Sequence, residues 1–252
     1  KGRVKHLSSV RYFFDTDELN ITPIGDIHYG SPECDIKRFV SVLELLKNND
    51  DKIILMGDLL EAASKHSVGS GWVAQKVTPQ QQLDDLYTWL YPFKDRILLL
   101  LDGNHEDRIY KHSGIDISGT LAKMLDVPYG GYACFVYLKV GKQGYIIYAQ
   151  HGASGATMPH TKMNAVKKTA IHTDADLYLY GHVHELGYDT VAKRYYDTRM
   201  KGIRKRYQTF VLTGSMLGYE GGYAERKNMY PSELGFATIK FSGKEKQLKV
   251  YA

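Results

Sequence analysis

Aspartate, glutamate, asparagine and histidine, the residue types that bind metal ions, recur in short turns between residues 25 and 184. The turns are Gly25-Asp26-Ile27-His28, Gly57-Asp58-Leu59-Leu60-Glu61, Gly103-Asn104-His105-Glu106, His151-Gly152 and Gly181-His182-Val183-His184. Carboxylate, amide oxygen and imidazole together suit a divalent first-row metal such as Mn²⁺, Fe or Zn²⁺. These groups outnumber the ligands of one open catalytic ion, so the pattern indicates two ions that share a carboxylate.

Each turn follows a short apolar run with the composition of a buried strand. The runs are Leu19–Ile24, Lys52–Met56, Arg96–Leu101, Tyr145–Ala149 and Leu177–Tyr180. Because ligands of α/β sheets bind beyond the carboxyl ends of the strands, we expect the turns to converge on one pocket. A single Asp-x-His or His-x-His is ordinarily a turn or a packing feature, but its recurrence at successive strand ends favours a site.

Helical patterns separate these runs. Asp35 is the expected N-cap of one helix, and Thr78 and Gln81 form a capping box that begins a second. Weaker helical patterns cover 116–126 and 161–172. Strands that alternate with helices predict an α/β fold with helices packed on a sheet.

The last third of the chain has strand patterns without long helices between them. We expect strands over 186–196, 207–213 and 235–251, the last a hairpin that turns at Ser242-Gly243-Lys244. The N-terminal segment Arg3–Phe14 is expected to pair with Leu19–Ile24 across a short turn.

We therefore predict one domain over residues 1–252. Its motif-bearing core would span 19–186, and a β-rich extension of antiparallel strands would span 187–252. Two stacked sheets would accommodate both parts.

Composition narrows the class of protein. The chain has 252 residues, of which 43% are hydrophobic and 24% charged, and this excludes a disordered chain. The longest purely aliphatic stretch, Ile97–Leu101, is far shorter than the ~20 residues of a membrane span. The two cysteines, Cys34 and Cys134, cannot form a disulfide framework, and the N-terminus lacks the apolar segment of a signal peptide. We expect a cytoplasmic protein with no membrane partner.

The order D-x-H, G-D-x-x-[DE], G-N-H-[DE], H and G-H-x-H resembles the calcineurin-like metallophosphoesterase superfamily. This resemblance implies a four-layer α/β/β/α sandwich with a dinuclear metal centre. From the donor types we expect two divalent ions, manganese first and iron or zinc as alternatives. It implies that Asp26, His28 and His184 bind one ion, that Asn104, His151 and His182 bind the other, and that Asp58 bridges them.

The resemblance also implies a mechanism. Two cations ~3.5–4 Å apart would acidify a bridging water for in-line attack on phosphorus. His105 would be the general acid for the leaving alcohol, and Glu61 would orient His105, although many members have the shorter aspartate there. Arg108 either contacts a substrate phosphate or is a helix-surface arginine that pairs with Glu106 or Asp107.

Residues 193–206 concentrate positive charge. They contain seven basic residues and one acid in a chain whose net charge is +5, with Tyr195, Tyr196 and Tyr207 among or beside them. This combination is typical of single-stranded nucleic-acid binding, in which Arg204, Lys205 and Arg206 would contact substrate and guide it towards the metals. The alternative is an exposed hairpin whose basic residues deter edge pairing.

Two further segments have alternative interpretations. Lys162, Lys167 and Lys168 are expected to form a solvated helix face. Trp72, in an irregular segment over 61–78, either walls the substrate pocket or packs on the following helix.

Together these patterns predict a metal-dependent phosphoester hydrolase. The first motif, Gly25 to Gly30, is more similar to the nuclease and the bacterial or phage phosphodiesterase branches than to the protein phosphatases. The expected activity is therefore a phosphodiesterase, with single-stranded nucleic acid as a candidate substrate. The alternatives are a phosphomonoesterase and a non-catalytic scaffold, and the complete ligand set disfavours the scaffold.

Overall fold

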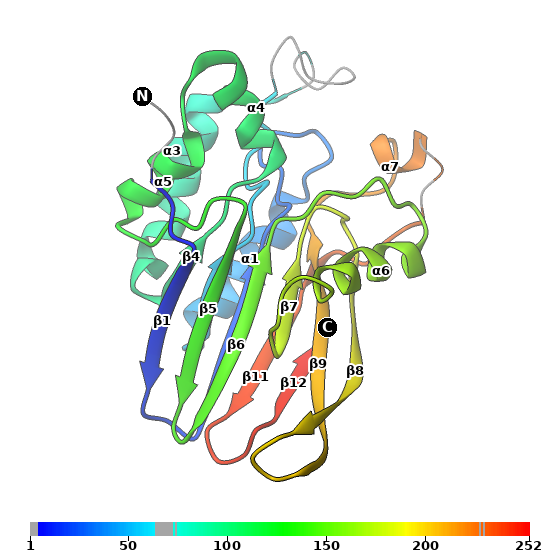
Figure 1. Ribbon diagram of the computed structural model, residues 1–252. Coiled ribbons are helices and arrows are strands. Elements are labelled where there is room, and N and C mark those ends of the chain that lie inside the picture. Colours follow the sequence, from blue (N-terminus) through cyan, green and yellow to red (C-terminus); the bar gives the residue numbers. More distant parts are fainter. Residues whose placement is uncertain (1–4, 64–72, 74, 227, 229) are drawn as a thin grey trace.

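The computed structural model describes residues 5–63, 73, 75–226, 228 and 230–252, and the expectation for Trp72 lies outside them. Two β-sheets stack face to face, with helices over their outer faces (Figure 1). One sheet has the order β1-β5-β6-β7-β9-β10, with β8 paired to β9, and the other has the order β12-β11-β2-β3-β4.

The strands and helices have the following bounds. The strands are β1 Ser9–Phe14, β2 Glu18–Ile24, β3 Lys52–Leu55, β4 Ile97–Leu100, β5 Ala133–Val140, β6 Gln143–Gln150, β7 Leu177–Tyr180, β8 Leu186–Asp197, β9 Gly202–Ser215, β10 Gly235–Phe236, β11 Thr238–Ser242 and β12 Leu248–Tyr251. The helices are α1 Ile36–Lys47, α3 Pro79–Leu90, the 3₁₀ helix η1 Tyr91–Arg96, α4 Asn104–Ser113, α5 Ile117–Leu125, α6 Pro159–Thr169 and α7 Tyr223–Arg226. None of the helices described here is long and apolar enough to cross a membrane.

Three apolar clusters define the four layers. Aliphatic residues from both sheets, such as Ile54 and Val136, fill the space between the sheets. The outer face of the β2-containing sheet packs against α1, α3 and α5 through residues that include Phe39 and Leu86. The outer face of the other sheet packs against α6, where Val166 contacts the cluster around Phe210. The α/β/β/α sandwich that the family resemblance implied is confirmed.

Local signals placed several helices correctly. The Asp35 side chain accepts a hydrogen bond from the Arg38 backbone N–H and caps α1. Thr78 and Gln81 make both bonds of the capping box at α3. Helices α5 and α6 occupy the two weaker patterns, and α6 begins at Pro159, earlier than expected.

The expected pairing of the N-terminal strand with Leu19–Ile24 is wrong. β1 instead pairs in parallel with β5, in the sheet that does not contain β2. Val10, Tyr12 and Phe14 point one way along β1 and pack into the core between the sheets. The turn after Phe14 therefore crosses from one sheet to the other, because both strands contribute their apolar faces to the same core.

Other strands also depart from the simplest expectation. β5 was not anticipated, and a helix at α4, which begins inside a motif turn, was considered only in the alternative that places Arg108 on a helix surface. In the predicted antiparallel extension, β8, β10, β11 and β12 pair antiparallel, but β9 also runs parallel to β7. The 242–244 turn joins β11 and β12 as predicted.

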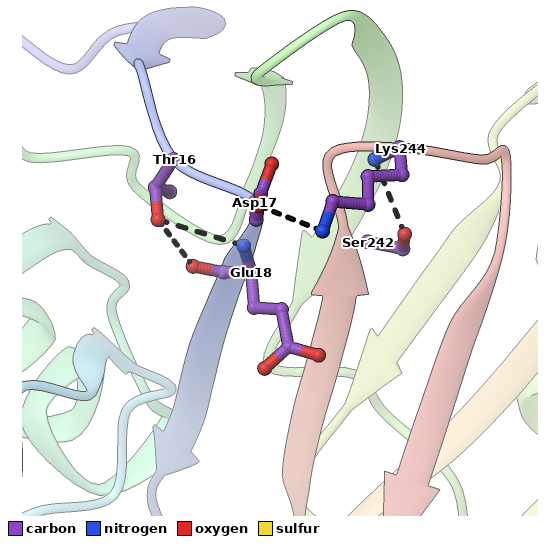
Figure 2. Close-up of a pocket in the computed structure, with 5 residues that line it drawn as sticks. All are labelled: Thr16, Asp17, Glu18, Ser242 and Lys244. Atoms are coloured by element: carbon purple, nitrogen blue, oxygen red, sulfur yellow. Dashed lines mark hydrogen bonds and ion pairs between the residues drawn. The ribbon is translucent and has the colours of Figure 1, made fainter.

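A surface pocket lies where the β1–β2 turn meets the β11–β12 turn (Figure 2). Thr16, Asp17, Glu18, Ser242 and Lys244 line it, and Lys244 makes an ion pair with Asp17 at 2.8 Å. The Gly243 N–H donates to the Asp17 carbonyl at 2.7 Å, so these two turns hold one end of the sandwich together. The motif turns lie at the other end.

Candidate metal centre

The motif turns meet at the carboxyl ends of β2, β3, β4, β6 and β7. Backbone hydrogen bonds join the first two turns, because Asp26 N–H donates to the Gly57 carbonyl at 2.9 Å and His28 N–H to the Asp58 carbonyl at 3.0 Å. The last turn joins them through its His182 N–H, which donates to both carboxylate oxygens of Asp26 at 3.0 and 2.9 Å. The predicted convergence of distant motifs is confirmed.

Asp26, His28, Asp58 and His184 form one group of donor atoms, all within 4.8 Å of one another. His184 Nε2 lies 3.2 Å from Asp26 Oδ1 and 3.1 Å from His28 Nε2. His28 Nε2 lies 3.7 Å from Asp58 Oδ2. Asp26, His28 and Asp58 are almost completely buried, so these donors converge away from bulk water.

A second group contains Asp58, His151 and His182, and Asn104 joins it. Asp58 Oδ2 lies 3.4 Å from His151 Nε2. Asn104 Oδ1 lies 3.1 Å from His151 Nε2 and 2.7 Å from His182 Nδ1. Asp58 thus belongs to both groups and lies between them. We call the seven side chains of the two groups the donor cluster.

Five residues of the donor cluster have left-handed backbone conformations. Asp26, His28, Asp58, His182 and His184 have φ values of 48°, 51°, 48°, 66° and 48°. For residues other than glycine this region costs on the order of 1–3 kcal/mol each, and such strain concentrates at functional sites. Here the strained conformation turns each side chain off the end of its strand.

Two glycines leave the space that the turns require. A Cβ atom at Gly103 would lie 2.1 Å from the backbone nitrogen of Asp58 and 2.2 Å from its Oδ1. Gly57 has φ +86°, and a Cβ there would lie 2.7 Å from the backbone of Asp102 and Gly103. The second and third turns therefore touch each other through glycine.

His105 and Glu61 lie beside the donor cluster. The Glu61 carboxylate is 3.3 Å from His28 Nδ1 and 3.5 Å from His105 Nδ1, and His105 Nδ1 is 2.9 Å from the Glu61 carbonyl oxygen. Because a carbonyl only accepts, Nδ1 carries the proton of that bond, which leaves Nε2 as the other exchangeable site. Glu61 thus contacts the predicted acid histidine and also a predicted metal ligand.

Glu106 has a supporting function that the sequence analysis did not assign. Its buried carboxylate accepts hydrogen bonds from the backbone N–H groups of Asp58, Leu59 and Leu60 at 3.1, 2.8 and 3.0 Å. These bonds hold the turn that carries Asp58. The signal for this role in the sequence was an acidic residue, Glu106, placed directly after the metal-ligand types of the third motif turn.

Charges in the cluster compensate one another. Burial opposes charge on His28, but Glu61, Asp58 and Asp26 raise its pKa to about 9. Burial likewise opposes charge on His151, yet Asp58 raises its pKa to about 10. Burial raises the pKa of Asp58, but the surrounding histidines outweigh this and hold that pKa well below its usual value. Protons thus supply the positive charge that the carboxylates require, and cations would displace them.

His105 differs from the other histidines. Burial and the neighbouring His28 lower its pKa to about 4, although Asp58 and Glu61 oppose this. Burial also favours the neutral form of Glu61, but His28, His105 and Arg108 lower the pKa of that carboxyl. Burial and the nearby carboxylates raise the pKa of Glu106, against the effect of its backbone hydrogen bonds.

Arg108 lies on α4, half-buried, close enough to influence Glu61 and His105 electrostatically. Neither acid proposed as its partner is free, because Glu106 binds the backbone and Asp107 makes an ion pair with Lys111 at 2.6 Å.

The structure does not bring Arg204, Lys205 and Arg206 to the donor cluster. They pair with residues 193–195 of β8, on the part of the β8–β9 hairpin that is distant from the motif turns. Arg194 lies eight residues beyond Leu186 along β8, about 26 Å at the usual strand rise. In Figure 1 the hairpin turn lies at the bottom, whereas α4 lies at the top.

Lys162 is a correction to the expected solvated face of α6. Its side chain is only 4% exposed, and Nζ makes an ion pair with Glu185 Oε2 at 2.8 Å. Glu185 follows His184 directly, so this ion pair ties α6 to the last motif turn. Lys167 is also paired, to Asp189 of β8.

The donor set fits divalent metal ions. It combines imidazole nitrogens, carboxylates and one amide oxygen in two adjoining groups that share a carboxylate, which is the chemistry of first-row divalent sites. The fold and this arrangement together define a metallophosphoesterase-type protein.

The family model of the calcineurin-like phosphoesterases matches residues 19–186, more than half of the chain. The chain belongs to the calcineurin-like phosphoesterase family. A search among curated proteins finds no significant match.

Several solved structures share low sequence identity with the chain over most of its length. Wild-type Vps29 complexed with zinc, from Entamoeba histolytica, is 13% identical, with a TM-score of 0.41, and 92% of this chain and 97% of that chain are covered. Vps29 from Cryptosporidium parvum is 13% identical, with a TM-score of 0.44 and coverages of 93% and 96%. An uncharacterized, predicted phosphoesterase from Streptococcus pneumoniae is 14% identical, with a TM-score of 0.38 and coverages of 93% and 97%.

Proposed function

We propose that this protein is a phosphodiesterase that depends on two divalent metal ions. The observation that carries the proposal is the position of Asp58, whose Oδ2 lies 3.7 Å from His28 Nε2 and 3.4 Å from His151 Nε2. A carboxylate between two groups of donors is what a pair of ions needs to share a ligand.

Each ion would have its own ligands besides Asp58. Asp26, His28 and His184 would hold one ion, and Asn104, His151 and His182 would hold the other. When bound, such ions supply Lewis acidity that activates water and neutralises charge on phosphoryl oxygens. Manganese is the first candidate, with iron or zinc as alternatives.

The residues around the ligands have positioning roles. The Glu61 carboxylate, 3.3 Å from His28 Nδ1, would orient this ligand as carboxylates beside metal-bound histidines do. Glu106 would hold the Asp58 turn through its three backbone bonds. Arg108 would bind a phosphate oxygen of the substrate.

His105 would donate the proton to the leaving alcohol from Nε2, because Nδ1 is bonded to the Glu61 carbonyl. In the chain alone the pKa of His105 is about 4, so the ring is neutral near pH 7. An anionic substrate against Nε2 favours the imidazolium and raises this pKa.

The diester preference rests on the first motif, Gly25 to Gly30, and its similarity to the phosphodiesterase branches of the family. The test compares bis(p-nitrophenyl) phosphate with p-nitrophenyl phosphate, with Mn²⁺ and with excess chelator. We expect turnover of the diester to exceed that of the monoester and to vanish with chelator. Faster monoester turnover would assign a phosphomonoesterase, and absence of metal-dependent turnover of either would assign a non-catalytic scaffold.

The role of His105 has its own test. A general acid contributes roughly 10²–10⁴-fold, and only where the leaving group needs a proton. His105→Ala should therefore lose about that factor with a diester that releases an alkyl alcohol, and much less with one that releases p-nitrophenolate. Equal losses for both substrates would show that His105 acts in another way.

A further inference from the structure

The β8–β9 hairpin extends beyond the rest of the sandwich at the end opposite the donor cluster (Figure 1). Residues 190–196 of β8 are exposed on both faces, whereas β9 is buried from Gln208 to Ser215. This part of the hairpin therefore presents two sheet faces to solvent.

Register identifies the residues that share one of these faces. Tyr196 is opposite Ile203, Arg194 opposite Lys205 and Ala192 opposite Tyr207. Opposite residues and every second residue along a strand point to the same side, so these six side chains form one surface, the hairpin face. It continues the side on which Val211 packs between the sheets.

The hairpin face places two exposed tyrosines around two cations. Tyr196, Ile203 and Tyr207 are 63%, 65% and 63% exposed. Arg194 and Lys205 lie directly opposite each other between them, an arrangement of like charges that destabilises a strand pair. Among the residues the structure describes, no acid lies within ion-pair distance of either cation.

Neighbouring cations do have acidic partners. Arg206 pairs with Asp174, and Arg204 Nε lies 3.5 Å from Asp197 Oδ2. Both point to the other side of the hairpin from Arg194 and Lys205. The two cations that lie directly opposite each other without an ion-paired acid are therefore on the face that also carries Tyr196 and Tyr207.

We propose that the hairpin face binds single-stranded nucleic acid, with phosphates at Arg194 and Lys205 and bases stacked on Tyr196 and Tyr207. An anionic strand would neutralise the two opposed cations, and aromatic rings on both sides of them match the alternation of phosphate and base. Basic residues that merely protect an edge strand would not require exposed tyrosines beside them. This binding is independent of hydrolysis at the donor cluster.

The test measures binding of a fluorescent oligothymidylate 20-mer by fluorescence anisotropy, in excess chelator so that no hydrolysis occurs. The pair Arg194→Gln and Lys205→Gln should weaken binding and reduce the slope of log affinity against log salt by about 1.4, since each phosphate contact in a single strand contributes about 0.7. Lys37→Gln with Arg38→Gln removes the same charge from exposed positions on α1 and is the matched control.

Tyrosine variants separate stacking from charge. Tyr196→Leu and Tyr207→Leu keep an apolar side chain but remove the ring, and each should weaken binding by about 5- to 140-fold. Heparin, a polyanion without bases, should bind these variants as it binds the wild type.

Three results would overturn the proposal. They are absence of oligonucleotide binding by the wild type, equal losses in the α1 control and the hairpin pair, and unchanged affinity in both tyrosine variants. If phosphatidylserine vesicles bind where the oligonucleotide does not, the face is assigned to a membrane surface.

Discussion

The two ends of the β-sheets differ in how their charged side chains are buried and paired. At the motif end, the carboxylates of Asp26 and Asp58 are buried, and histidines surround them at 3.2 to 3.9 Å. At the hairpin end, Arg194 and Lys205 face each other in solvent without a described acidic partner. Buried charge of mixed sign fits small cations, whereas exposed charge of one sign beside aromatic rings fits a polyanion. Residue types alone do not separate these two kinds of site, but burial and partners do.

The largest effect is expected at Asp58. Asp58→Asn removes the carboxylate that the two donor groups share, so turnover should fall to that of chelator-treated wild type. Asp51→Asn is the matched control, because Asp51 is a buried carboxylate just before the other end of β3, where it accepts bonds from Asn20 and Thr22. The measurement is metal-dependent hydrolysis of bis(p-nitrophenyl) phosphate. Equal losses in both variants would contradict a special role for Asp58.

A smaller effect is expected at Glu106. Both of its carboxylate oxygens accept from the Asp58 turn, and the amide of Glu106→Gln provides only one acceptor. Loss of an outer partner of a metal ligand typically costs about 10–100-fold in metal affinity or activity. The concentration of Mn²⁺ that gives half-maximal turnover should rise accordingly, while turnover at saturating Mn²⁺ partly recovers. An unchanged metal dependence would show that the turn holds its shape without Glu106.

Lys162 should affect stability more than chemistry. Lys162→Met leaves Glu185 without its partner in a nearly buried setting, and breaking such a pair costs about 3 kcal/mol. Denaturant unfolding of the metal-free protein measures this loss. The variant Lys162→Met with Glu185→Gln should recover most of the stability, because no unpaired charge remains. Equal stability of the single and double variants would argue against the ion pair.

No effect on small substrates is expected at the hairpin end. Arg194→Gln with Lys205→Gln should leave hydrolysis of bis(p-nitrophenyl) phosphate unchanged, since these residues lie about 26 Å along β8 from its motif end. A loss of turnover greater than a few-fold would show that the two ends are coupled.

Sequence patterns predicted the motif end well. Glycine turns after apolar runs indicated strand ends, and the carboxyl ends of strands in stacked α/β sheets lie together, so donors far apart in the chain could be assigned to one place. The same local logic placed the Asp35 cap and the Thr78 capping box. These signals are local, and tertiary contacts did not override them.

Long-range relations could not be predicted in the same way. β1 pairs with β5 rather than with β2, its neighbour in sequence. This pairing is set by the tertiary arrangement of the two sheets, and no local sequence pattern indicates it. Lys162 has the sequence context of a surface helix, and only the position of Glu185 makes it a buried partner. The positive charge of the basic segment could be read from the sequence. Its distance from the motif turns could not, because that distance depends on the length and direction of β8.

The most direct test of a dinuclear centre counts the ions. Metal-free protein is dialysed against Mn²⁺ at rising concentrations, and bound metal and diester turnover are measured on the same samples, with Asp58→Asn beside the wild type. We predict two ions per chain in the wild type, with turnover that follows occupancy of the second, and fewer than two in the variant. One ion or none at saturating Mn²⁺, or turnover that does not respond to metal, would contradict the account.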